Sequence, residues 1–180
     1  MSDPVPEFPE DASDRGHYNM QILLPAAEKL GEALKKRGET VAVAESSSGG
    51  LIAASLLSVP GASAYFIGGA VFYTRKSLKE LLALRDDQFA QMRGLTESTA
   101  ILLANAIRER LATTWALAEI GASGPTGSRY GDPAGTSCIA VAGPRNRAQS
   151  VKTNQPDRAA NMQLFAQSAL DLFAQIVLTP

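Results

Sequence analysis

Apolar residues along the chain follow two patterns, one with helical spacing and one in short continuous runs. Helical spacing is found at Leu23, Ala27, Leu30 and Leu34. Three basic residues and then Gly38 follow, which is typical of a helix that ends at a glycine cap. The β-branched run at residues 40–44 predicts a buried strand, and the apolar residues 51–57 predict a buried helix. The first part of the chain should therefore form a helix, a strand, a turn and a second helix.

The same two patterns continue through the rest of the chain. Further strands are predicted at residues 65–73, 115–120 and 136–142, with an edge strand at 150–153. A short helix is predicted from Arg75 through the leucines at 78, 81 and 82, and another helical turn is predicted to begin at Asp86. A longer helix should run from a cap at Thr96 or Ser98 to Leu111, and a final helix from a cap at Asp157 to Ile176. Strands that alternate with helices in this way indicate a layered α/β domain with helices on both faces of a sheet.

Length and composition fit a single folded domain. The chain has 180 residues, of which 45% are hydrophobic and 19% charged, enough apolar material for one sizeable core. Residues 1–18 are rich in Asp, Glu and Pro, which predicts a flexible acidic, proline-rich arm. We therefore expect one domain over residues 19–180.

Charge and cysteine content exclude several classes of partner. The formal net charge is −1 and no stripe of Lys and Arg with interleaved aromatics occurs, so nucleic acid is not an expected partner. No stretch reaches membrane-spanning length, so no membrane is expected either. The sole cysteine, Cys138, excludes a disulfide framework and a cysteine-based zinc cluster, and we expect a reduced, cytoplasmic setting.

The candidate chemistry is concentrated in residues 44–50, Ala-Glu-Ser-Ser-Ser-Gly-Gly, between the predicted strand and helix. A helix start offers unpaired N–H groups and a positive dipole end, and glycines allow a ligand to approach the main chain, so this turn could bind an anion or oxyanion. Ser47 and Ser48 are expected as turn and cap groups, whereas Glu45 could orient a base or satisfy backbone N–H groups. The only histidine, His17, lies in the predicted arm, which argues against a Ser-His-Asp triad.

Four sequence blocks resemble the C-terminal domain of the competence/damage-inducible CinA proteins. Residues 44–50 resemble that family's Ala-Glu-Ser-Cys-Thr-Gly-Gly, and residues 69–74 resemble its glycine-to-tyrosine strand. Residues 121–125 and 133–136 resemble its Gly-Ile-Ala-Gly-Pro loop and its Pro-Val-Gly-Thr strand start, and Asp157-Arg158 falls where the family has Gly-Asp-Arg. The resemblance extends over roughly residues 20–176.

This resemblance implies a three-layer α/β/α sandwich with a mixed sheet that forms a homo-oligomer. It implies an amidohydrolase that converts nicotinamide mononucleotide and water to nicotinate mononucleotide and ammonia, with a small-molecule nucleotide substrate and neither metal nor cofactor. Ser46 matches the nucleophile of this family. Ser48, Gly49 and Gly50 would bind the substrate at the helix start, where backbone N–H groups can stabilise an oxyanion.

The general base implied by the resemblance is a lysine five residues after the strand tyrosine, a position that Leu78 occupies here. Lys79 is the better substitute by helical geometry and Lys76 the poorer one, because successive residues are about 100° apart around a helix. Lys79 is therefore a candidate base, with a solvated surface lysine as the alternative interpretation. Tyr73 could position the lysine or the substrate, or belong to the core.

The glycine-rich segment 121–128 can be interpreted as a phosphate cradle or as a turn that ends a strand. The resemblance favours a cradle formed by Gly121, Ser123, Gly124, Thr136 and Arg158, with Arg129 as a further candidate. A phosphate monoester needs N–H groups, a hydroxyl and a guanidinium together. Ser128 and Asp132 depart from the family pattern, which leaves open a different ligand.

Two functions fit these observations. The first is deamidation with Ser46 as the nucleophile and Lys79 as a displaced base. The second is a nucleotide-binding or regulatory domain that keeps the fold and the phosphate pocket but has lost the chemistry. Leu78 favours the second function, and the retained serine turn favours the first. We expect the first, because Ser46, the glycines, Tyr73, Thr136 and Arg158 are retained together.

Overall fold

A five-stranded mixed sheet forms the middle layer of the molecule. The computed structural model describes residues 19–92 and 94–179, so the predicted arm at residues 1–18 lies outside the described part. The strands are β1 (Val41–Glu45), β2 (Phe66–Val71), β3 (Trp115–Ala122), β4 (Thr136–Ala142) and β5 (Arg147–Lys152). Their order is β2-β1-β3-β4-β5, with β1 parallel to β2 and β3, and with antiparallel β3/β4 and β4/β5 pairs.

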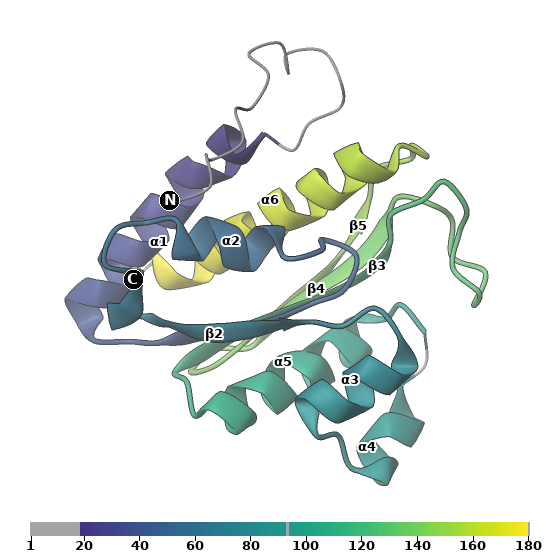
Figure 1. The fold of residues 1–180 in the computed structure, drawn as a ribbon, viewed down its shortest axis with the longest axis horizontal. Helices are drawn as coiled ribbons and strands as arrows, with labels where there is room; N and C mark the ends of the chain where they lie inside the picture. The colour runs from purple at the N-terminus through teal and green to yellow at the C-terminus, as the bar shows by residue number, and fades with distance from the viewer. Residues whose placement is uncertain (1–18, 93, 180) are drawn as a thin grey trace, which may run out of the picture.

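Helices cover both faces of this sheet (Figure 1). One face carries α1 (Met20–Arg37), α2 (Leu51–Leu57) and α6 (Arg158–Val177), and the other carries α3 (Arg75–Leu82), α4 (Asp86–Gln91) and α5 (Glu97–Leu111). A short 3₁₀ turn, η1 (Ala62–Ala64), precedes β2. The structure therefore confirms the three-layer α/β/α sandwich with a mixed sheet.

The ends of the helices follow their predicted caps. Gly38 closes α1 in the left-handed conformation, and its N–H group donates to the carbonyl groups of Leu34 and Lys35. Of the two candidate caps for α5, Thr96 is the one that accepts a hydrogen bond from a backbone N–H group at the helix start. The side chain of Asp157 caps α6 in the same way.

The edge strand β5 begins at Arg147, three residues before the strand predicted at 150–153. Its residues are polar and partly exposed, so no apolar run marks where it begins.

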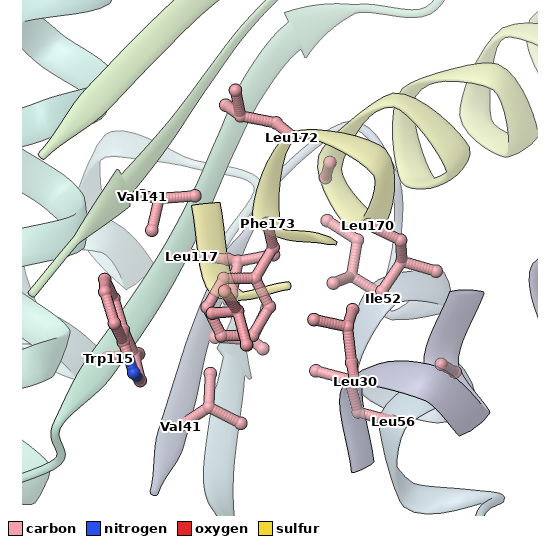
Figure 2. Packing of buried hydrophobic residues seen from close by; sticks show 14 of the residues in the cluster. Leu30, Val41, Ile52, Leu56, Trp115, Leu117, Val141, Leu170, Leu172 and Phe173 are labelled. Atoms are coloured by element: carbon pink, nitrogen blue, oxygen red, sulfur yellow. The ribbon is translucent and has the colours of Figure 1, made fainter. Parts of the chain in front are cut away.

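Two hydrophobic clusters lie on opposite sides of the sheet, and the two-residue period of β1 supplies both. Val41 and Val43 face the cluster beneath α1, α2 and α6, whereas Ala42 and Ala44 face the cluster beneath α5. Figure 2 shows the first cluster, in which Phe173 of α6 packs edge-on against Trp115 of β3, with ring centroids 5.9 Å apart.

In the part of the chain that the structure describes, no helix is long and apolar enough to cross a bilayer.

The aromatic contact of Phe173 should contribute strongly to stability. Phe173 is completely buried, so Phe173→Ala should lower the free energy of unfolding by about 3–5 kcal/mol, through lost transfer energy and a cavity. Leu164→Ala on the same helix is the matched control, because Leu164 is 42% exposed and its truncation should cost much less. Urea denaturation followed by circular dichroism measures both changes, and equal losses would contradict the packing described.

Candidate active site

The sheet topology brings the candidate site residues to one edge. Ser46 follows β1, Tyr73 follows β2, and Ser123 follows β3, and these three strands are parallel neighbours. Their carboxyl ends therefore lie at the same end of the sheet, drawn at the right in Figure 1. The strand β5 runs in the same direction, so Arg158 at the start of α6 also lies at this end.

A pocket of about 450 Å³ opens at this end of the sheet. Seven of the predicted site residues line it: Ser46, Tyr73, Gly121, Ser123, Gly124, Arg158 and the further candidate Arg129. Five do not: Lys79, Ser48, Gly49, Gly50 and Thr136. The structure therefore assembles the candidate nucleophile with one wall of the predicted phosphate cradle, and it separates both from the expected base.

Ser46 and Leu78 line the same pocket. The Ser46 side chain is half-buried, and its hydroxyl has no hydrogen-bond partner among the described residues. Leu78 is only 4% exposed and packs in the cluster beneath α5. The position at which the resemblance places a lysine thus lies at the pocket, and an apolar side chain occupies it.

The expectation that Lys79 takes over as the base does not agree with the structure. Its amine lies 2.5 Å from Oδ1 of Asp86 on the exposed side of α3, and Lys79 is absent from the pocket wall. The hydrogen bond and charge of Asp86 raise the pKa of Lys79, which is the opposite of what a general base at neutral pH requires. The alternative interpretation of a solvated surface lysine describes this residue.

The residue that sequence reasoning missed is Glu119, which is fully buried in β3. Its carboxylate accepts hydrogen bonds from the backbone N–H groups of Ser46 (3.2 Å) and Ser48 (2.8 Å). Hydroxyl groups of Ser47, Ser48 and Ser137 donate to the same carboxylate. The available signal was a single acidic residue within an otherwise apolar predicted strand, because such a residue is buried only when it is well paired.

Glu45 occupies the helix start that was expected to bind an anion. Its carboxylate accepts from the backbone N–H groups of Gly50 (3.0 Å), Ile52 (3.1 Å) and Ala53 (2.8 Å). The Ser48 hydroxyl lies between Glu45 and Glu119, 2.8 and 2.9 Å from their Oε2 atoms. Burial raises the pKa of Glu45, and the charge of Glu119 adds to this rise. The hydrogen bonds to Glu45 act to lower the pKa, but burial outweighs them.

The substrate-binding role expected for Ser48, Gly49 and Gly50 is therefore corrected. The N–H groups at the start of α2 already have an acceptor in Glu45, and the Ser48 hydroxyl is buried between two carboxylates. Gly49 and Gly50 instead permit the left-handed backbone of the turn, with φ values of +68° and +99°. An oxyanion would need donors other than these.

Gly121 and Gly124 permit close approaches of the chain rather than forming a complete phosphate cradle. A Cβ atom on Gly121 would lie 2.5 Å from Oγ of Ser47, and one on Gly124 would overlap the carbonyl of Pro156. Ser123 and Thr136 both bury a hydroxyl without a partner among the described residues, but only Ser123 lines the pocket.

The pocket wall is cationic. Arg75, Arg129 and Arg158 line it, and no aspartate or glutamate does so among the described residues. Arg158 donates to the carbonyl of Gly124 (2.7 Å) and to the Tyr73 hydroxyl (2.9 Å). Guanidinium groups recognise carboxylates and phosphates through paired N–H donors, so this wall suits an anionic ligand.

The architecture and site define a three-layer α/β/α domain with a cationic pocket at the carboxyl ends of its parallel strands. The chain belongs to the CinA C-terminal domain family, whose model matches residues 24–177.

Several known proteins are similar to this chain. A CinA-like protein of Trichormus variabilis is 36% identical over 156 residues, covering 85% of this chain and 38% of that protein. A putative competence-damage inducible protein of Desulforamulus reducens is 42% identical over 115 residues, or 64% of this chain and 28% of that protein. The chain thus spans well under half the length of these relatives.

The fold agrees with solved structures of this superfamily. The competence/damage inducible protein CihA from Agrobacterium tumefaciens superposes with a TM-score of 0.79 at 22% identity, covering 88% of this chain and 96% of that one. A CinA superfamily protein from Enterobacter cloacae has the same TM-score and identity, with 86% and 92% covered. At this identity the likeness establishes the fold.

The carboxylate of Glu119 should be essential for stability. Glu119→Ala leaves several buried donors without an acceptor and should lower the free energy of unfolding by at least about 3 kcal/mol. Glu119→Gln should also destabilise the domain, because an amide group replaces one acceptor oxygen with a donor.

Glu80→Gln provides the matched control, since Glu80 is exposed on α3 and its neutralisation should change stability by less than about 0.5 kcal/mol. Urea midpoints and slopes compare the three variants with the unmodified chain. A Glu119→Gln protein as stable as Glu80→Gln would refute the assigned hydrogen bonding.

Proposed function

We propose that this domain binds a phosphate-bearing nucleotide in the pocket at the strand ends. The observation that carries the proposal is the set of three arginines on a wall without acidic side chains. A phosphate group carries up to about two negative charges at neutral pH, and guanidinium donors stabilise it through charge-assisted hydrogen bonds. The volume of about 450 Å³ lies within the range of small-molecule sites.

Aromatic and apolar side chains provide the rest of a nucleotide site. Tyr73 is 67% exposed and lines the pocket, with the Arg158 guanidinium 5.6 Å from its ring centroid. Phe72, Leu78 and Ile120 add an apolar wall. A planar base can pack against such surfaces while its phosphate contacts arginine.

The same geometry supports binding over hydrolysis by a serine and a lysine. A serine hydroxyl needs a base within hydrogen-bonding distance to become a nucleophile. Leu78 cannot accept a proton, and the Lys79 amine is paired with Asp86 and has a raised pKa. We therefore favour a nucleotide-binding domain without this deamidation chemistry.

Deamidation of nicotinamide mononucleotide is the second candidate. The observation that favours it is Ser46, which lines the pocket on a turn held by Glu119. A base other than Lys79 would have to take the serine proton before ammonia could leave.

Titration calorimetry and an ammonia-release assay with nicotinamide mononucleotide distinguish the two candidates. The unmodified chain should bind the nucleotide and release no more ammonia than Ser46→Ala, because no lysine, histidine or carboxylate among the described residues lines the pocket to activate the serine. Ammonia release that disappears in Ser46→Ala would instead establish the deamidase. Failure of the chain to bind this nucleotide would reject nicotinamide mononucleotide as a ligand.

Leu78→Lys tests whether a missing amine is what prevents the reaction. The new amine would lie at the pocket with Ser46, and the three arginines would lower its pKa by like-charge repulsion. Ammonia release should rise in Leu78→Lys and disappear when Ser46→Ala is added. Lys79→Ala is the matched control and should behave as the unmodified chain. A Leu78→Lys protein that binds the nucleotide but releases no ammonia would show that more than the amine is missing.

A further inference from the structure

The three arginines of the pocket fall into two groups, held by different partners. Arg158 is tied to the carbonyl of Gly124 and to the Tyr73 hydroxyl. Arg75 instead donates to the Tyr130 hydroxyl over 3.3 Å, and the Arg129 guanidinium lies 5.1 Å from the Tyr130 ring centroid. Tyr130 therefore gathers two guanidinium groups at a place separate from the contacts of Arg158.

This second group is positioned but not neutralised. Among the described residues, neither Arg75 nor Arg129 forms an ion pair. The Arg75 guanidinium packs over the Phe89 ring, 4.2 Å from its centroid, which holds it in place without removing its charge. The hydrogen bond from Arg75 lowers the pKa of the Tyr130 phenol, and Arg129 contributes further to this decrease. A lowered phenol pKa is what positive charge beside Tyr130 produces.

A buried hydroxyl in the same pocket also lacks a partner. Ser123 is 2% exposed, lines the pocket, and its Oγ atom forms no hydrogen bond with the described residues. Buried polar groups are normally hydrogen-bonded, so an unpaired hydroxyl in a cavity wall is a donor suited to a ligand acceptor. Ser123 directly precedes Gly124, whose carbonyl accepts a hydrogen bond from Arg158, and we assign the Ser123 hydroxyl to the first group on that basis.

The charge on the wall exceeds what one phosphate group neutralises. Three guanidinium groups carry three positive charges, whereas a phosphate monoester supplies about −1.5 to −2 at neutral pH. Two linked phosphoryl groups supply about one charge more, and they would offer separate acceptors to the N–H donors of Arg158 and to those of Arg75 and Arg129. A ligand with two anionic groups therefore matches the wall better than a monoester.

We infer that Arg75 and Arg129, assembled by Tyr130, form a second anion subsite, so that the pocket takes a diphosphate-bearing nucleotide in preference to a monophosphate. The inference rests on the proposed nucleotide function and specifies the class of nucleotide. In this arrangement Arg158 and Ser123 bind one phosphoryl group, and the Tyr130 pair binds the other.

Titration calorimetry with inorganic phosphate and inorganic pyrophosphate, without divalent cations and at fixed low salt, tests the second subsite. Pyrophosphate should bind the unmodified chain about tenfold more tightly, as one added charge-assisted contact predicts. Arg75→Gln and Arg129→Gln should each remove most of this preference, with phosphate affinity changed less than about threefold. Arg158→Gln should weaken both ligands.

Arg147→Gln is the matched control, because Arg147 is exposed and begins β5 at the opposite end of the sheet. It should leave both affinities unchanged. Equal affinities for the two anions in the unmodified chain would overturn the second subsite, as would equal weakening of both anions by Arg75→Gln and Arg129→Gln. If nicotinamide mononucleotide still binds in that case, the proposed nucleotide function is retained and only the second anion subsite is rejected. If no phosphate-bearing ligand binds, the proposed function fails as well.

Discussion

The buried carboxylate of Glu119 is the interaction on which the site depends. The chain must leave β1, turn and enter α2 within a few residues, and the backbone N–H groups of Ser46 and Ser48 would otherwise be buried without acceptors. Glu119 comes from the neighbouring strand β3, so its hydrogen bonds fix the turn relative to the sheet. Because Gly121 has no side chain, the Ser47 hydroxyl can approach the same carboxylate. The position of Ser46 at the pocket follows from this network.

The paired carboxylates also decide where an anion can bind. Glu45 accepts hydrogen bonds from the N–H groups at the start of α2, so these donors are already occupied. A ligand phosphate would find none of these three N–H groups free. The positive charge of the site comes instead from Arg75 at the start of α3, Arg129 on the loop after β3 and Arg158 at the start of α6. The two carboxylates stabilise the turn, and the arginines provide the attraction for a ligand.

Local signals were sufficient to predict the fold but only part of the site. Helix caps such as Gly38 and Asp157 act within a few residues of sequence, and the apolar runs of β1 and β4 mark buried strands directly. The partners of Glu119 come from two other segments, so its role depends on strand pairing that no local pattern contains. Lys79 was misjudged for a related reason. Helical geometry gave its approximate direction, but the competing carboxylate of Asp86 belongs to the next helix.

The composition of the pocket wall bears on what the domain can do with a bound ligand. Arginine side chains in the same pocket as Ser46 would stabilise an alkoxide, yet a guanidinium group cannot accept the serine proton. Leu78 places hydrocarbon at the position where the resemblance implies a lysine, and an apolar surface favours contact with a ligand ring. The arginines attract anions whether or not a reaction follows. A wall of this kind would discriminate ligands by their charge and shape, as the proposed nucleotide-binding function requires.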